Sequence, residues 1–300
     1  MSKHVAVLMG GWSSEREVSL ISGAAVSNSL KTSGYRVTTI DVQRDLGVLL
    51  TRLFPRPDVV FNALHGRFGE DGCVQGLLDI LDIPYTHSGL LASALAMNKP
   101  MAKRLFAAAD IPVPEGKVVG SDEVIAAEAM APPYVIKPLN EGSSVGVHII
   151  FEDDGKHSLA ANWPFGDRVL VERYIPGREL TVAVMGDQAL AVTEITTSAG
   201  FYDYSAKYDE GASTHLIPAP VPSAVYGEAL KLAVLAHRSL GCRGVSRADF
   251  RYDGDKLFIL ELNTQPGMTP MSLVPEQAAH AGKSFDELVI WMVENAECDP

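Results

Sequence analysis

The chain has 300 residues, of which 47% are hydrophobic, and this length is enough for two or three domains of ordinary size. Its 37 acidic and 25 basic residues give a net charge of −12, which argues against nucleic acid as a partner but not against a nucleotide held by a few lysines and helix N-termini. No run approaches the roughly 18 apolar residues of a membrane helix, and no signal peptide is recognisable, so we expect a cytoplasmic protein without membrane contact.

Three cysteines stand far apart in the chain, at Cys73, Cys242 and Cys298. Their odd number and wide spacing indicate neither a disulfide framework nor a CxxC metal or redox site.

Alternating strand and helix patterns mark the N-terminal third of the chain. Apolar and β-branched runs predict strands at His4–Met9, Tyr35–Asp41 and Pro57–Leu64, with helical patterns between them. Ser14 and Glu17 match a capping box at the start of the first helix. The order strand, helix, strand, helix, strand predicts an open, parallel α/β sheet.

The middle of the chain changes character after a predicted helix from Asn98 to Ala109 and a stiff connection at Ile111–Pro114. Short strands separated by turns then indicate an antiparallel sheet, with strands predicted at Tyr134–Lys137, Gly146–Ile150, Arg168–Glu172 and Glu179–Val184.

A polar stretch with glycines and aromatic residues occupies positions 198–221 and is longer than a passive loop usually is. We expect it to be a lid or a binding element. A helix at Ser223–Leu240, strands at Gly244–Arg251 and Lys256–Leu262, and helical patterns up to Glu294 complete the prediction.

One short catalytic pattern occurs, GxSxG at Gly142–Gly146, which in hydrolases presents a nucleophilic serine, here Ser144, between a strand and a helix. In this chain a second strand pattern follows instead, which indicates a hairpin tip. Such a tip can lie over a polyphosphate, with Lys137 supplying positive charge, or it can be an ordinary solvated turn. Neither GxxxxGK[ST] nor a GxGxxG following a strand is present.

Two adjacent predicted strands near the C-terminus carry polar side chains on matching faces. Alternation places Arg247 and Asp249 together on one strand, and Glu261 with Asn263 on the next. Two carboxylates and an amide oxygen are suitable ligands for Mg²⁺ carried with phosphates, and a neighbouring arginine can stabilise developing negative charge. The alternative is a solvent-facing sheet surface with an ion pair, but burying carboxylates among apolar neighbours favours a cation site.

Six blocks in the same order together resemble the D-alanine:D-alanine ligase family of the ATP-grasp superfamily. These blocks are Gly10–Glu17, His65–Gly72, Met97–Lys99, Glu141–Gly146, Phe201–Tyr208 and Glu261–Met268. They span almost the whole chain, which makes a chance match far less probable than for any single motif.

The resemblance implies an α/β ATP-grasp fold of three domains. These are a parallel, open N-terminal domain (1–96), a central domain (97–182) and a C-terminal domain (183–300), the last two being mixed or antiparallel α+β domains that enclose ATP. It also implies ATP-dependent joining of two D-alanines through an acyl phosphate for peptidoglycan synthesis, with two Mg²⁺ (or Mn²⁺) ions as cofactors and a homodimer as the assembly.

The family's functional residues carry over to matching positions. For the amino-acid substrates and the chemistry, the resemblance implies Glu15, His65, Ser143, Tyr208, Arg247, Gly267, Ser272 and Leu273. For ATP it implies Lys99, Lys137, Glu172, Ile175, Glu179 and Lys207. For the metal ions it implies Asp249, Glu261 and Asn263. Tyr208 is the residue that relatives forming dipeptides carry, whereas relatives forming esters typically have phenylalanine.

Three alternatives stay open at this point. One is another ATP-grasp carboxylate–amine ligase. The second is a serine hydrolase that uses Ser144, Asp249 and His280. The third is a nucleotide-binding protein without activity, although such a protein has no need of an arginine that stabilises an oxyanion.

Overall fold

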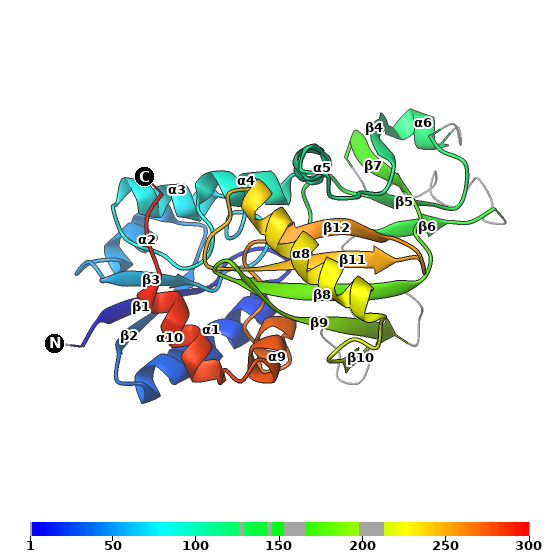
Figure 1. Cartoon of the computed structure of the whole chain (residues 1–300). Coiled ribbons are helices and arrows are strands. Elements are labelled where there is room, and N and C mark those ends of the chain that lie inside the picture. Colours follow the sequence, from blue (N-terminus) through cyan, green and yellow to red (C-terminus); the bar gives the residue numbers. More distant parts are fainter. Residues whose placement is uncertain (1, 126–128, 143–145, 153–165, 198–212, 300) are drawn as a thin grey trace.

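The computed structural model describes residues 2–125, 129–142, 146–152, 166–197 and 213–299, and the helices and strands below refer to these parts (Figure 1). A parallel three-stranded sheet forms the N-terminal part, in the order β2-β1-β3. Its strands are β1 (His4–Gly10), β2 (Arg36–Val42) and β3 (Val59–Asn62). The predicted parallel α/β sheet is therefore confirmed.

Helices cover both faces of this sheet, because its central strand is apolar on both sides. The helices of the N-terminal part are α1 (Arg16–Thr32), α2 (Leu46–Arg52), α3 (Cys73–Ile80) and α4 (Leu90–Met97). One apolar core includes Leu8, Ile40 and Leu78, and the core on the opposite face includes Val7, Val26 and Phe61.

The predicted capping box at the start of α1 is wrong. Glu15 occupies the N-cap position, and no side chain caps the helix there. Ser13, rather than Ser14, shapes the entry, because its Oγ accepts a hydrogen bond from the backbone N–H of Glu15 at 3.2 Å. The hydroxyl of Ser13 also donates to the carbonyl of His65 at 2.7 Å, which ties this turn to another loop.

A four-stranded antiparallel sheet forms the central part, in the order β4-β7-β5-β6. Its strands are β4 (Gly116–Gly120), β5 (Tyr134–Lys137), β6 (His148–Ile150) and β7 (Arg168–Arg173), with the short helix α6 (Ser121–Ile125) after β4. The hairpin predicted from the pattern around Gly146 is present as β5 and β6.

A five-stranded antiparallel sheet forms the largest part, in the order β10-β9-β8-β11-β12. Its strands are β8 (Arg178–Met185), β9 (Gln188–Thr197), β10 (Ser213–Leu216), β11 (Val245–Tyr252) and β12 (Leu257–Asn263). The long helix α8 (Ser223–Ser239) and α5 (Lys99–Ala108) share the apolar core of this sheet. Figure 1 shows α8 lying across one face of the strands.

Two sequence predictions about this region need correction. β8 belongs to the five-stranded sheet, between β9 and β11, and not with the short strands that precede it. The stretch 198–221 is not entirely a loop, because Ser213–Leu216 form β10 against β9. Residues 198–212 lie outside the described part of the chain.

The C-terminal helices return to the N-terminal sheet. They are α9 (Leu273–His280) and α10 (Phe285–Glu294), and Leu288, Val289 and Met292 enter the core that contains Val7. Figure 1 shows α10 beside the blue N-terminal elements. Among the described helices, none has both the length and the apolar character needed to cross a membrane.

The predicted domain boundary between residues 182 and 183 falls inside β8, and α5 packs against the five-stranded sheet although it was assigned to the central domain. The change of sheet occurs between Arg173 and Arg178. We therefore propose a central domain that ends within residues 174–177. We also propose that α10 be counted with the N-terminal core.

Candidate active site

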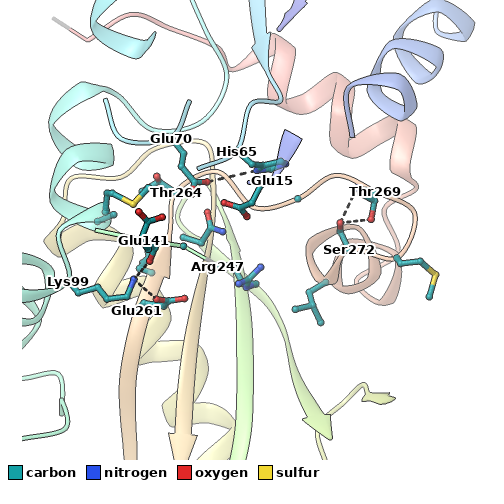
Figure 2. Close-up of a pocket in the computed structure, with 18 residues that line it drawn as sticks. Glu15, His65, Glu70, Lys99, Glu141, Arg247, Glu261, Thr264, Thr269 and Ser272 are labelled. Carbon is teal, nitrogen blue, oxygen red and sulfur yellow. Dashed lines mark hydrogen bonds and ion pairs between the residues drawn. The ribbon is translucent and has the colours of Figure 1, made fainter. Parts of the chain in front are cut away.

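A central cavity opens where the three parts of the chain meet (Figure 2). The N-terminal loops, the start of α5, the residues after β5 and the ends of β11 and β12 all contribute to its wall. The predicted site residues that line it are Glu15, His65, Lys99, Arg247, Glu261, Asn263, Gly267, Ser272 and Leu273. Positions far apart in the sequence thus surround one space.

The N-terminal wall of the central cavity carries a histidine between two carboxylates. Glu15 and His65 are each only 6% exposed, and His65 Nδ1 lies 3.9 Å from Glu70 Oε2. Figure 2 shows Glu15, His65 and Glu70 side by side. Within the described residues, the buried Nε2 of His65 has no hydrogen-bond partner. A buried nitrogen of this kind is suited to meet a polar ligand, because leaving it unpaired costs free energy.

The close packing of this wall depends on Gly66, which has φ of +71°. A Cβ added there would lie 2.9 Å from the Ser13 Cβ and 3.0 Å from Glu15 Oε2. Position 66 in the loop after His65 therefore accommodates glycine but no larger residue without a shift of its neighbours.

Gly66→Ala is expected to lower the free energy of unfolding by about 1–2 kcal/mol for the left-handed backbone and by roughly 1 kcal/mol or more for the clash. The matched control is Gly34→Ala, because Gly34 has φ of +88° but nothing within 4 Å of an added Cβ. Urea unfolding measures the free energy of unfolding of both variants, and the difference between their losses is the cost of the clash at Gly66. Equal losses in the two variants would show that the loop tolerates a side chain at Gly66.

Lys99 lines the central cavity and is the first residue of α5. The helix is capped by Asn98, whose side chain accepts from the Met101 N–H at 3.1 Å. Lys99 Nζ lies 3.1 Å from Glu261 Oε2 and donates to the backbone carbonyl of Glu141 at 2.5 Å. Figure 2 shows these contacts as dashed lines. The ammonium thus joins β12 to the segment after β5.

An intersheet cavity adjoins the central cavity, and both are bordered by Lys99, Glu141 and Glu261. It lies between the four-stranded and five-stranded sheets, with apolar walls from residues such as Val135 and Leu260. The predicted site residues that line it are Lys99, Lys137, Glu172, Ile175, Glu179, Asp249 and Glu261. An apolar slot that also carries charged side chains is suited to a flat ring that carries an anionic tail.

Glu172, at the end of β7, is 2% exposed and lies between two ammonium groups. Lys137 Nζ is 2.5 Å from Glu172 Oε2, and Lys103 Nζ is 2.7 Å from Oε1. Burial alone would raise the pKa of Glu172, but the two lysines outweigh it and hold that pKa below its usual range. Burial also lowers the pKa of Lys103, and attraction to Glu172 only partly opposes that shift.

Lys103→Met is expected to destabilise the protein by about 2 kcal/mol or more, since it removes one cationic partner of a buried carboxylate and leaves part of its desolvation cost uncompensated. The pKa of Glu172 should rise, because one of its two cationic neighbours is lost. Lys231→Met on α8 is the matched control, because its ion pair with Glu228 is largely exposed. Chemical unfolding at neutral pH compares the two. An equally small loss of unfolding free energy in both variants would contradict the structural role of Lys103.

β11 and β12 bring the predicted metal ligands together in register. Arg247 lies opposite Asn263, and Asp249 lies opposite Glu261. Two carboxylates directly opposite one another repel unless cations neutralise them. In the structure Arg247 holds Asp249 through two hydrogen bonds of 2.8 and 2.7 Å, while Lys99 neutralises Glu261.

Each of these ligands also has a protein partner that orients it. Thr181 donates to Asp249 Oδ1 at 2.6 Å, and the Gln265 N–H donates to Asn263 Oδ1 at 2.8 Å. Among the described residues, no set of three or more His, Cys, Asp or Glu side chains is arranged to hold a metal ion. The predicted set contains two carboxylates and an amide, and such hard oxygen donors fit Mg²⁺ carried with phosphates.

The outer end of the intersheet cavity is organised by Arg251. Its guanidinium donates to the carbonyls of Ile175 and Gly177 at 3.1 and 3.0 Å and lies 3.3 Å from Glu179 Oε2. These contacts hold the turn between β7 and β8 against β11. Glu179 and Ile175 therefore line the cavity at this turn, and the family resemblance implies nucleotide contacts for both residues.

The segment between β12 and α9 forms the far wall of the central cavity. Ser272 is the N-cap residue of α9, but its hydroxyl accepts from the Thr269 N–H at 2.9 Å instead of capping the helix. A Cβ added to Gly267 would lie 3.0 Å from Ser272 Oγ, so the turn is tight there. Together with Leu273, these residues point a loop and a helix N-terminus at the cavity, which favours an anion.

Four residues named from the sequence lie outside the described part of the chain, namely Ser143, Ser144, Lys207 and Tyr208. The hydrolase alternative nevertheless loses its structural context. β6, not a helix, follows Gly146, and Asp249 bonds Arg247 and Thr181. His280 is an exposed residue in the last turn of α9.

Lys103 and Glu70 were not among the residues singled out from the sequence. For Lys103 a usable signal exists, because Lys99, Lys103 and Phe106 recur at helical spacing and share the buried face of α5. A lysine on an apolar face indicates a buried anionic partner. Glu70 lies five residues after His65 in the same glycine-rich loop, but neither residue's surroundings follow from local pattern alone.

Comparisons with known proteins agree with this arrangement. A family model described as "D-ala D-ala ligase C-terminus" matches residues 105–294, and another described as "D-ala D-ala ligase N-terminus" matches residues 51–88. Similar proteins named D-alanine–D-alanine ligase come from Rhodospirillum rubrum, with 60% identity over 100% of both chains, and from Parvibaculum lavamentivorans, with 57% identity over 99% of both chains.

Solved structures give the same result. The structure of the D-alanine–D-alanine ligase from Bacillus anthracis complexed with ATP covers 98% of this chain and 96% of its own, with a TM-score of 0.84 and 30% identity. A second structure of that enzyme has a TM-score of 0.85 and 31% identity over 98% of this chain and 97% of its own. The expected ATP-grasp fold is thus confirmed, and the chain belongs to the D-alanine–D-alanine ligase family.

Proposed function

We propose that this protein joins two D-alanines to D-alanyl-D-alanine at the expense of ATP, releasing ADP and phosphate, for peptidoglycan synthesis. The observation that carries the proposal is the meeting of two cavities at Lys99, Glu141 and Glu261. An amino-acid site and a nucleotide site that share one wall place a carboxylate next to a terminal phosphate. Relatives with 57–60% identity over nearly the whole chain are named D-alanine–D-alanine ligase.

In the proposed reaction, a carboxylate oxygen of the first D-alanine attacks the γ-phosphorus of ATP, and ADP leaves. The resulting acyl phosphate is then attacked at its carbonyl carbon by the amine of the second D-alanine. That amine loses a proton, and inorganic phosphate leaves with the transferred oxygen. The position of the central cavity between three parts of the chain supports this sequence, because an acyl phosphate exposed to water would be hydrolysed.

The buried carboxylate of Glu15 attracts the ammonium group of the first D-alanine, and His65 beside it contacts the same substrate. The far wall at Gly267, Ser272 and Leu273 receives the carboxylate of the second D-alanine, which the N-terminus of α9 favours. Arg247 lies between these walls and stabilises the oxyanion that forms during amine attack. Opposite charges on opposite walls thus orient the two substrates head to tail.

The nucleotide occupies the intersheet cavity in this proposal. Lys99 and Lys137 contact its phosphates, while Glu172, Ile175 and Glu179 contact the adenine and ribose. The apolar walls support the adenine position, and the ATP-bound structure from Bacillus anthracis supports the choice of nucleotide. Lys207, Ser143 and Tyr208 are proposed to complete the lid over the site, but they lie outside the described residues.

Asp249, Glu261 and Asn263 are proposed to hold two Mg²⁺ or Mn²⁺ ions. Such ions neutralise the β- and γ-phosphates and draw off charge during phosphoryl transfer. Pairing of Asp249 directly opposite Glu261 supports the assignment, because a divalent cation relieves the repulsion between them. Within the protein itself, Lys99 and Arg247 already perform part of this neutralisation.

We also propose a cytoplasmic homodimer. Use of ATP as substrate supports the location. Exposed apolar side chains on α3 and α4 support the assembly, namely Ile80 at 84%, Leu90 at 43% and Leu91 at 64% exposed. Sedimentation equilibrium on the purified chain tests the assembly, and a single species of about one chain mass would refute it.

The function is tested by incubating the purified chain with ATP, Mg²⁺ and D-alanine while measuring phosphate and dipeptide together. One phosphate per dipeptide is expected. D-serine and D-lactate, offered separately as second substrate, distinguish other ligase specificities within the family. Absence of both phosphate and dipeptide under these conditions would overturn the proposal.

A further inference from the structure

Three buried amide side chains meet behind the central cavity. Asn62 ends β3, Gln75 lies in α3, and Gln265 follows β12. Their exposed fractions are 0%, 1% and 0%, although none of them lines the central cavity. Buried amides are costly unless their donors and acceptors are paired, so their position requires a reason.

The three amides bond to one another and to a single loop. Asn62 Nδ2 and Gln75 Nε2 both donate to the carbonyl of Gly69, at 2.9 and 3.0 Å. The same two groups contact Gln265 Oε1, at 2.9 and 3.4 Å. Gln265 Nε2 in turn donates to the carbonyl of Leu64.

The two carbonyls that receive these bonds belong to the residues just before His65 and Glu70. The loop carrying both side chains into the central cavity is therefore fixed at each end. Asn62 and Gln75 come from the same N-terminal part as the loop, whereas Gln265 comes from the C-terminal part. Only Gln265, of these three, can fix the loop relative to β12.

Gln265 also contacts the proposed metal site. Its backbone N–H donates to Asn263 Oδ1 at 2.8 Å, which uses one of the two lone pairs of that oxygen and leaves the other for a cation. One residue thus holds the His65 loop through its side chain and orients Asn263 through its backbone.

We propose that Gln265 is a positioning residue that sets the amino-acid site at its working distance from the phosphate-transfer site. The inference rests on the proposed function, because it assigns His65 to the first D-alanine and Asn263 to the metal. An amide suits this task, since it accepts from Asn62 and donates to Leu64 at the same time. A carboxylate would lose the donor, and an apolar chain would lose both bonds.

The test compares Gln265→Met with Gln277→Met in the full chain. Gln277 is also 0% exposed, and its side chain accepts from the Ala183 N–H at 2.8 Å and donates to the Thr181 carbonyl at 3.1 Å. Each variant removes the hydrogen bond that a buried glutamine donates to a backbone carbonyl and the bonding that its Oε1 accepts, from Asn62 and Gln75 for Gln265 and from the Ala183 N–H for Gln277. Both should therefore lower the Tm, but only Gln265→Met should raise the KM for D-alanine, by about tenfold.

In Gln265→Met the KM for ATP should change far less than the KM for D-alanine, because the backbone N–H that orients Asn263 is retained. Gln75→Met should raise the KM for D-alanine more weakly. Its effect should not add to that of Gln265→Met, since the two side chains share one hydrogen-bond network. If Gln265→Met does not fold, Gln75→Met alone still tests whether the network sets the KM for D-alanine.

A KM for D-alanine within twofold of wild type in Gln265→Met, together with a Tm loss like that of Gln277→Met, would overturn the inference. Additive effects of the two substitutions would do the same. Failure of the proposed function is distinguishable, because the wild-type chain would then form no dipeptide in the same assay.

Discussion

Glu261→Gln is expected to lower kcat for ATP-dependent phosphate release by about 10³-fold, since removing one preorganised electrostatic group at a transfer site costs roughly 10²–10³. Glu261 borders both cavities, lies opposite Asp249 and pairs with Lys99 at 3.1 Å. Glutamine has nearly the same shape but no charge, so Lys99 and the proposed cations lose an anionic partner. Coupled phosphate release at saturating ATP and D-alanine measures the effect.

The fold should survive this substitution, because the Glu261 side chain is 26% exposed and glutamine keeps its volume. Glu228→Gln on α8 is the control, with the same chemical change at an exposed position. Circular dichroism and Tm should match for both variants, while only Glu261→Gln loses activity. Phosphate release at the wild-type rate in Glu261→Gln would remove the basis for the metal assignment.

Arg247→Met is the substitution expected to affect both activity and stability. Asp249 is 8% exposed and, among the described residues, would keep only the hydrogen bond from Thr181, so a carboxylate without a cationic partner would remain buried. Breaking a buried pair in this way costs about 3–5 kcal/mol. Loss of the proposed oxyanion contact should also lower kcat by roughly 10²–10³-fold. Urea unfolding and steady-state kinetics measure the two effects separately.

Arg238→Met provides a matched comparison, because Arg238 also pairs with an aspartate, Asp187, through Nε at 2.9 Å. That pair is exposed, with side chains 59% and 72% accessible, and such pairs contribute about 0–1 kcal/mol. The free energy of unfolding and the kcat of Arg247→Lys should lie between those of wild type and Arg247→Met, since lysine keeps the positive charge but cannot make the bidentate contact with Asp249. Similar stability losses in Arg238→Met and Arg247→Met would contradict the buried role of Arg247.

Local sequence pattern predicted the elements whose burial is simple. β1 is apolar along its length because both of its faces are covered, and α8 follows one amphipathic stripe. Alternation along β11 and β12 correctly placed Arg247 with Asp249 and Glu261 with Asn263, because the side-chain period of a strand is two. The register that sets Asp249 opposite Glu261 was not required by that pattern.

Most of the errors in the predicted fold involve contacts between residues far apart in the sequence. β8 reads like the short strands before it, but it pairs with β11, about 65 residues later in the chain, and only the folded sheet reveals this. β9 lies between β8 and β10 and was absent from the prediction. The capping-box pattern at Ser14 and Glu17 failed because Ser13 bonds a distant carbonyl, that of His65.

Buried polar contacts were the least predictable part of the site. The helical spacing of Lys103 indicates a buried anionic partner, but only the four-stranded sheet identifies that partner as Glu172. Likewise, Gln265 follows Asn263 in a recognisable block, but its contacts with Asn62 and Leu64 cross about 200 residues of sequence. For both residues the side-chain type indicates which contacts are possible, whereas the identity of the bonding partners depends on the fold.

The most direct measurement uses D-alanine labelled with ¹⁸O in both carboxylate oxygens. If the carboxylate attacks the γ-phosphorus of ATP where the two cavities meet, one ¹⁸O from the first D-alanine must leave in the inorganic phosphate. Mass spectrometry should then find one labelled oxygen per phosphate and one lost from the dipeptide. Unlabelled phosphate, formed together with dipeptide while the departing ¹⁸O is found in water or in the nucleotide, would contradict the account.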